Sequence, residues 1–158
     1  DLTDFNLTDA NLTHADLTGA NLTDANLTDA NLTGAAGICA ERITPLLILL
    51  DQTGTIIAYK LVTDYGEGPF NGGIVYREGE TYEVVDADTN PSHPCGVGIH
   101  LATLDWCLRE WKPGYRVMLA EFAASDIAAI PTGTDGKFRV RRCRIIGEKD
   151  ISHIVVPA

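Results

Sequence analysis

The first 35 residues contain no lysine or arginine, although they contain six aspartates. The formal charge of the 158-residue chain is −10, and six of its negative charges therefore lie in this short stretch. An acidic chain is repelled by phosphate, so nonspecific binding of nucleic acid is an unfavourable function for it.

Cysteine and long apolar runs are also scarce. The four cysteines include no Cys-x-x-Cys pair; they are Cys39, Cys95, Cys107 and Cys143. Scattered cysteines in a domain of this size indicate buried reduced thiols rather than a disulfide framework. No apolar run approaches the roughly eighteen residues of a membrane-spanning helix, and the run from Ile43 to Leu50 is much shorter. We therefore expect no membrane partner.

Leucine recurs every five residues at the start of the chain, at positions 2, 7, 12, 17, 22, 27 and 32. From Ala10 onward a small residue stands two positions before each leucine, whereas Phe5 is bulky. A period of five matches neither a helix face nor the alternation of a strand. Repetition at a fixed period predicts a solenoid, in which each unit buries its apolar side only against its neighbours.

This repeat closely resembles the pentapeptide-repeat family, whose motif is Ala, then Asp or Asn, then Leu, then two variable residues. The resemblance implies a right-handed quadrilateral β-helix for residues 1–37, with residues twenty apart stacked on each other. Leu7 is then expected over Leu27 and Leu12 over Leu32. Seven repeats make fewer than two coils, so we expect the end of a longer array or a coil end covered by another subunit.

The same twenty-residue register places Asp4 over Asp24 and Asp9 over Asp29. Stacked carboxylates at about 4.8 Å repel each other. They can attract cations or a basic partner, or imitate a phosphate backbone as a DNA-mimicking topoisomerase inhibitor does. They can equally be a solvated face.

The remainder predicts a joint at residues 38–45 and a compact α+β, mostly antiparallel domain at 46–158. The chain as a whole is expected to be mainly β. We expect strands at 46–50, 55–62, 74–76, 81–85, 99–102, 115–122 and 137–147, with a last short pairing at 155–156. Loops are expected at 64–73 and 86–98, and one helical turn at 125–130. One helix should begin after Thr103 and end near Trp111, because apolar residues there follow helical spacing.

Residues 59–146 resemble an uncharacterised domain of phage proteins, through the motifs Ala58-Tyr59-Lys60, Tyr76, 79–83, Cys95, Gly98-Ile99-His100 and the basic stretch 137–145. That family assigns no activity. A weaker resemblance to ADP-ribosyltransferases rests on Gly96, Gly98, Ile99 and Ala102. It implies a nucleotide or NAD site lined by Tyr59, Lys60, Gly96, Gly98, His100 and Thr103, with Glu121 or Glu148 as the acid.

Two further readings of the same loop stay open. Cys and His are suitable zinc ligands, and the candidates are His93, Cys95, His100 and Cys107, although their spacing is irregular. Cys95 and His100 can also form a nucleophile and base pair, but no third group orients them. We favour buried thiols and ordinary histidines, and assign no catalytic residue, metal or cofactor.

Five basic residues crowd the predicted strand at 137–147: Lys137, Arg139, Arg141, Arg142 and Arg144. This strip can meet phosphate or the acidic repeat of a neighbouring subunit. Alternatively it is a charged edge strand that prevents aggregation.

The sequence thus favours a non-enzymatic structural or protein-interaction module of phage-like origin. It should assemble into a homo-oligomer or larger protein assembly through coil ends and charged faces. A phage origin would place it in the virion or the host cytoplasm. The alternatives are the NAD-binding enzyme and the topoisomerase inhibitor.

Overall fold

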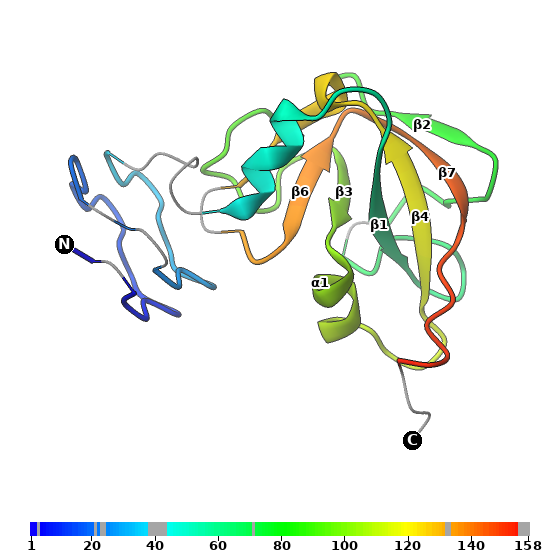
Figure 1. Cartoon of the computed structure of the whole chain (residues 1–158), viewed down its shortest axis with the longest axis horizontal. Helices are drawn as coiled ribbons and strands as arrows, with labels where there is room; N and C mark the ends of the chain where they lie inside the picture. The colour runs from blue at the N-terminus through cyan, green and yellow to red at the C-terminus, as the bar shows by residue number, and fades with distance from the viewer. Residues whose placement is uncertain are drawn as a thin grey trace.

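A computed structural model describes residues 1–2, 4–20, 22, 25–37, 44–70, 72–131 and 134–154. We call residues 1–37 the repeat segment and residues 44–154 the sheet region. The repeat segment lies to one side of the sheet region (Figure 1). The predicted joint falls almost wholly at residues 38–43, and the last predicted pairing at 155–156; both lie outside the described residues.

The sheet region is mainly β. It contains one seven-stranded antiparallel sheet in the order β2-β7-β4-β1-β3-β6-β5. The strands are β1 (Ile56–Val62), β2 (Thr81–Glu83), β3 (Ile99–Ala102), β4 (Arg116–Phe122), β5 (Ile127–Ala129), β6 (Lys137–Val140) and β7 (Arg142–Glu148). The helical elements of the described residues are the 3-10 helices η2 (Pro45–Asp51) and η3 (Ala124–Asp126) and the α-helix α1 (Leu104–Arg109).

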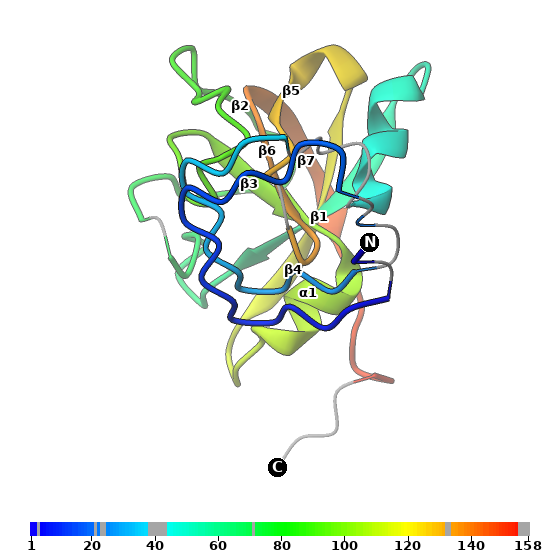
Figure 2. The same ribbon diagram turned by 90° about the vertical axis from the view of Figure 1, so that its left-hand side faces the viewer.

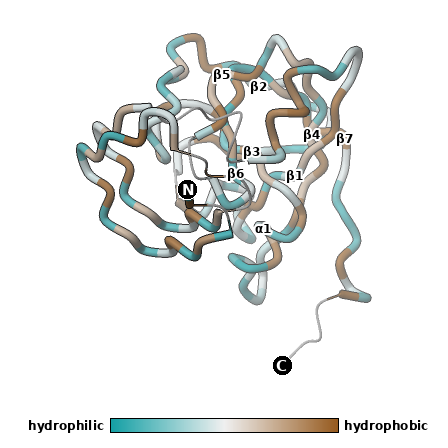
Figure 3. The backbone as a smooth tube through the Cα atoms, turned by 60° about the vertical axis from the view of Figure 1, so that its left-hand side comes forward, coloured by the Kyte–Doolittle hydropathy of each residue, from teal (hydrophilic) through white to brown (hydrophobic). Residues whose placement is uncertain are grey.

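The repeat segment runs as two passes, the first over residues 4–20 and the second over residues 25–37. They lie side by side as open loops in Figure 2. Isolated parallel bridges join Asn6 to Asn26, Asn11 to Asn31 and Asp16 to Ala36. Each pair is twenty residues apart, so the expected stacking register is confirmed. Hydrophilic and hydrophobic residues alternate along both passes, as Figure 3 shows.

Side-chain chemistry fixes the turns of the repeat. The amide oxygen of Asn6 accepts a hydrogen bond from Thr8 N at 3.0 Å, and Asn11 accepts the same bond from Thr13 N at 3.1 Å. The position after the threonine has a left-handed backbone, with φ of 61° at Asp4 and 58° at Asp9. Asp, Asn and Gly tolerate this conformation better than other residues. The turn therefore accounts for part of the aspartate content.

The predicted right-handed quadrilateral β-helix is nevertheless wrong. The described repeat residues form turns and isolated bridges, whereas the strands of the protein lie in the single antiparallel sheet. Burial gives the reason. Only Leu22 and Leu27 are buried, and the other five leucines of the repeat stay half-exposed. So few units cannot enclose the continuous apolar core that a solenoid requires.

The main core lies on one face of the sheet. Alternate residues of its central strands point into this core, among them Ala58, Leu101, Ala120, Phe138 and Ile145. The other face carries a smaller cluster in which Trp106 and Cys107 of α1 pack against Leu61 and Val117. The chain is mainly β, as expected. Among the described residues α1 is the one α-helix, and it cannot cover a sheet face, so the sheet region is a single antiparallel sheet rather than the expected α+β domain.

The pairing of β1 shapes the site described below. β1 pairs with β4 at all seven of its residues, but with β3 at one position only, Tyr59 opposite Ala102. The sheet consequently opens between β1 and β3 beyond that pair.

Four other predicted elements need correction. Residues 46–50 belong to η2 rather than a strand, because Pro45 stands in its first turn and the Thr44 hydroxyl accepts a bond from Leu46 N. Residues 74–76 contribute only a bridge between Val75 and Glu67. The helical turn expected at 125–130 is η3 followed by β5. The strand at 137–147 is divided at Arg141 into β6 and β7, which pair with different neighbours.

No helix among the described residues is long and apolar enough to cross a membrane. Strands 56–62, 99–102 and 116–122 lie where the alternation pattern predicts them, as do the loops before and after β2.

Truncating Phe138 tests the main core. Phe138 is buried, and its ring lies 5.6 Å from that of Phe122. Phe138→Ala should lower the free energy of unfolding by about 3–5 kcal/mol. Tyr65→Ala removes a ring that is 81% exposed and should change it by less than about 0.5 kcal/mol. Urea unfolding of both variants measures the difference; equal losses would contradict the assigned core.

Candidate functional site

The acidic positions of the repeat are exposed turn residues. Asp4, Asp9 and Asp29 are all exposed. Asp24 lies outside the described residues, so its stacking under Asp4 stays a prediction. Asp9 N donates to Thr28 O at 3.0 Å, which places Asp9 beside the turn that contains Asp29. Two carboxylates therefore share one outer surface of the repeat.

Arg139 of β6 is an internal residue, with no exposed surface. Its guanidinium donates three hydrogen bonds to carbonyl groups of the loop before β3: Nε to Asp88 at 3.0 Å, Nη2 to Asn90 at 2.8 Å, and Nη1 to His93. Asp88 Oδ2 lies 3.8 Å from Nη2. Arg139 is thus a structural residue and offers no charge to a partner.

The loop that Arg139 holds is also closed by its own polar groups. Asp88 accepts from Asn90 N at 2.8 Å, and its other oxygen contacts His93 Nδ1 at 2.7 Å. Asn90 N and the His93 contact hold the pKa of Asp88 below its ordinary value. Gly96 must lack a side chain here, because an added Cβ would collide with the Asp88 carboxylate.

The other four basic residues of the predicted strip lie in different environments. Lys137 Nζ donates to Cys95 Sγ at 3.3 Å and lies 5.7 Å from the ring centroid of Trp106. Arg141 is half-buried between β6 and β7. Arg142 and Arg144 are exposed on β7, and Arg144 lies 3.2 Å from Glu121. A single basic strip is therefore not formed; β7 carries the exposed part.

A cavity of about 310 Å³ lies between the sheet and the loop that Arg139 holds. It brings together four residues that the sequence placed in one pocket: Lys60, Gly96, Gly98 and His100. The remaining lining residues are Gly72, Ile74, Tyr76, Val84, Cys95 and Val97. Sequence reasoning missed the apolar wall of Ile74 and Val84. The sequence placed them on short strands at 74–76 and 81–85, and that pattern did not indicate that the two segments face one cavity.

Two predicted pocket residues lie elsewhere. Tyr59 lines a much smaller neighbouring space of about 20 Å³, which Lys60 and His100 also reach. The Thr103 hydroxyl lies close to Gly136. It is buried without a hydrogen-bond partner among the described residues, and it does not cap α1.

Burial perturbs the two basic groups of the cavity, Lys60 and His100. Desolvation lowers the pKa of Lys60 to about 8. It also lowers the pKa of His100 to about 4, assisted by the nearby charges of Lys137, Lys60 and Arg139. The hydrogen bond of His100 Nε2 to Gly96 O, 2.9 Å long, acts in the opposite direction. His100 is therefore neutral at pH 7 and donates to this carbonyl.

The proposed acids of the NAD-binding enzyme do not reach this cavity, whereas Cys95 and His100, the alternative nucleophile and base, both line it. Glu121 and Glu148 pair with Arg144 and Arg116, at 3.2 and 3.5 Å, and neither lines the cavity. Cys107 and Cys143 are buried thiols whose pKa burial raises to about 12. Cys95 is exposed, so the expectation of a buried thiol is wrong for it. Among the described residues, no cluster of three or more acidic, cysteine or histidine side chains is placed to hold a metal ion. Cys39 lies outside those residues.

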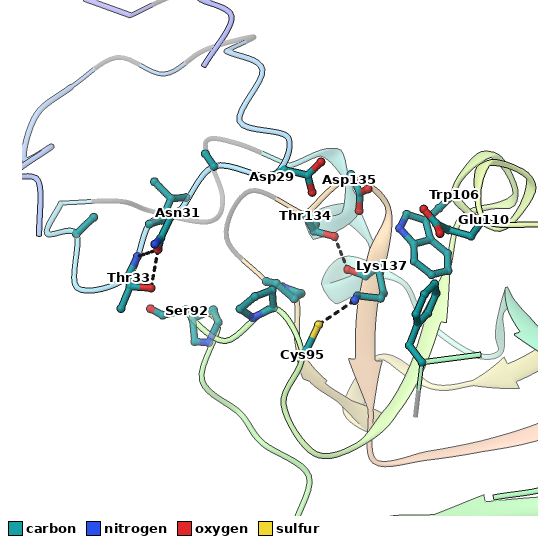
Figure 4. Close-up of a pocket in the computed structure, with 17 residues that line it drawn as sticks. Asp29, Asn31, Thr33, Ser92, Cys95, Trp106, Glu110, Thr134, Asp135 and Lys137 are labelled. Atoms are coloured by element: carbon teal, nitrogen blue, oxygen red, sulfur yellow. Dashed lines mark hydrogen bonds between the residues drawn. The ribbon is translucent and has the colours of Figure 1, made fainter. Parts of the chain in front are cut away.

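A second, larger hollow of about 650 Å³ lies between the repeat segment and the sheet region. Figure 4 shows Asp29, Asn31 and Thr33 on the repeat side, facing Cys95, Thr134 and Lys137 on the sheet side. The hydroxyl of Thr134 donates to Lys137 O across the sheet-side wall. This hollow places the carboxylate of Asp29 on the same opening as the Lys137 ammonium.

Comparison with known proteins bears on the repeat segment. The family model described as pentapeptide repeats matches residues 1–36, in eight copies. No curated protein and no solved structure matched the chain. Pentapeptide repeats suggest a structural or protein-interaction module.

Replacing Arg139 tests its structural role. Arg139→Met should lower the free energy of unfolding by about 3–5 kcal/mol, because three carbonyl groups of the loop lose the donor that holds them and Asp88 loses its cation. Arg142→Met removes an exposed arginine and should change it by less than about 0.5 kcal/mol. Chemical unfolding compares the two. Equal stability of the variants would show that Arg139 does not support the loop.

His100 predicts a pH dependence of stability. Its folded pKa of about 4 is below the ordinary 6.5, so between these values the unfolded chain binds a proton that the folded chain does not. Stability should fall as pH drops from 6.5 toward 4. His100→Gln should remove about 1 kcal/mol of the loss between pH 7 and pH 5, after allowance for solvent screening. Urea midpoints at both pH values measure this. An unchanged slope, matching that of the exposed control His153→Gln, would contradict it.

Proposed function

We propose that this protein is a non-enzymatic structural or protein-interaction module that assembles through the exposed edges of its repeat segment and its charged surfaces. The observation that carries the proposal is the one-sided pairing of the two passes. Asn26 N donates to Phe5 O at 2.9 Å, and Asn26 O accepts from Leu7 N at 2.7 Å. The second pass thus directs these groups to the first.

Among the described residues, the corresponding groups of the first pass have no backbone partner. Asn6, Asn11 and Asp16 make no backbone hydrogen bond through N–H or C=O to another described residue. Unpaired donors and acceptors in a row are a template for another chain. Phe5, 54% exposed at this edge, adds apolar surface that a partner can cover.

Charge supports association between copies. The repeat presents Asp4, Asp9 and Asp29, whereas β7 presents Arg142 and Arg144. Opposite charges on separate surfaces of one chain favour contacts between copies and steer their encounter. Arg139 has no part in this, because it is buried.

The biological context is a further part of the proposal. A phage-like origin rests on the sequence resemblance of residues 59–146, and in that context the partner is a virion or host protein. The exposed edge needs only a second repeat segment, so self-assembly is the simplest form of the function.

The mass in solution, measured by light scattering at low and high salt, tests this function. We expect an oligomer that weakens as salt screens the charged surfaces. The double variant Arg142→Glu with Arg144→Glu should weaken self-association about tenfold, which corresponds to about 1.4 kcal/mol. The control Arg77→Glu with Lys112→Glu makes the same change in net charge at other exposed positions and should stay within about twofold.

A monomer at both salt concentrations would contradict the proposal that this chain self-assembles. If the β7 double variant forms an oligomer of unchanged mass, the charged surface of β7 does not contribute to assembly. The edge of the repeat segment would then remain as the proposed interface.

A further inference from the structure

Lys60 is a buried charged residue of the sheet region. It is only 6% exposed, in the middle of β1. Its ammonium lies 4.8 Å from the ring centroid of Tyr76. Within the described part of the chain, no carboxylate forms an ion pair with it.

A buried cation without a counter-charge is costly. An aromatic ring contributes roughly 0.5–2 kcal/mol to such a cation, whereas removal of an ammonium from water costs several kcal/mol. Hydrophobic residues of similar length fit such positions at no comparable cost. A lysine at this position therefore points to an anion that completes the site from outside the chain.

The cavity described above supplies the space for that anion. Lys60 lines it, and no Asp or Glu is among its lining residues. Lys137 and Arg139 do not line it either, so among the described residues Lys60 is the one cation that faces the cavity. One cation balances one negative charge. Ligands with two or more phosphate charges, such as NAD, would bring an excess of charge into a small space.

The remaining walls favour an apolar body on the ligand. Ile74, Tyr76, Val84 and Val97 line the cavity together with glycine backbone. A volume of about 310 Å³ lies at the lower end of small-molecule pockets. The shape and chemistry suit one ring or a short chain that bears one charged group.

We propose that this cavity binds a small amphipathic carboxylate, which pairs with the Lys60 ammonium and packs its apolar part against Ile74, Tyr76 and Val84. This binding function is separate from assembly through the repeat. Arg139 positions the loop that closes the cavity, because its hydrogen bonds fix Asp88, Asn90 and His93 just before the lining residues Cys95 to Gly98.

Isothermal titration of the full chain at pH 7 tests this site, with benzoate as the probe and benzyl alcohol as its neutral counterpart. Benzoate should bind the wild-type chain at least tenfold more tightly than benzyl alcohol. Lys60→Met keeps the length of the side chain but removes the charge, and should weaken benzoate at least tenfold. Lys112→Met, an exposed control, should bind benzoate as the wild type does.

Absence of benzoate binding to the folded wild-type chain, or equal binding to Lys60→Met, would overturn the proposal. Val97→Asp provides a second variant that keeps Lys60. Val97 is 58% exposed at the cavity wall, so this change should leave the fold intact. The new carboxylate should weaken benzoate at least tenfold by repulsion, and unchanged affinity would also overturn the proposal.

Thermal unfolding without ligand separates a binding role of Lys60 from a purely structural one. If Lys60 is kept for a ligand, Lys60→Met should unfold at the same temperature as the wild type or a higher one. Benzoate should raise the unfolding temperature of the wild type and leave that of the variant unchanged. A lower unfolding temperature for the variant, together with no benzoate effect on either chain, would make Lys60 a structural residue.

Discussion

The guanidinium of Arg139 holds the loop between β2 and β3 against the sheet. Three of its N–H groups donate to carbonyl oxygens of Asp88, Asn90 and His93, and the Arg139 side chain itself is fully buried. Buried hydrogen bonds from a charged donor are strong, and their loss leaves carbonyl groups without a partner. The same loop continues into the lining of the cavity, so the geometry of that cavity depends on this one side chain.

The opening of the sheet between β1 and β3 is the second constraint. A full ladder would bring the two strands together along their length, but they pair only at Tyr59 and Ala102. Lys60 follows Tyr59, and His100 lies two residues before Ala102. Both side chains line the space beside this pair. Burial lowers the pKa of both side chains, so His100 is neutral at pH 7. The charged form of Lys60 is costly here unless a counter-ion lies beside it.

The sequence predicted some features well because they depend on local pattern. The twenty-residue register of the repeat followed from its period, and the bridges at Asn6, Asn11 and Asp16 agree with it. β1, β3 and β4 followed from alternation. The gathering of Lys60, Gly96, Gly98 and His100 followed from a motif resemblance rather than from a physical pattern.

Other features depend on contacts that one sequence does not display. We expected Arg139 to belong to an exposed basic strip, yet Arg139 and its β6 neighbours Phe138 and Val140 are all buried. Arg139 is buried because the loop before β3 covers it and accepts its hydrogen bonds. These bonds join residues about fifty positions apart in the sequence. The continuous β-helix failed because its core requires more stacked units than residues 1–37 contain. The strand expected at 46–50 failed because a Thr and Pro start signal favours a helical turn.

Exchange of backbone amide protons for deuterium, followed at low and high protein concentration, tests the central claim most directly. If the repeat segment is an interface, the amides of Asn6, Asn11 and Asp16 should become protected as concentration rises, while the sheet amides keep the same rates. Unchanged exchange of residues 4–18 at concentrations where the chain is oligomeric would place the interface elsewhere and contradict the account.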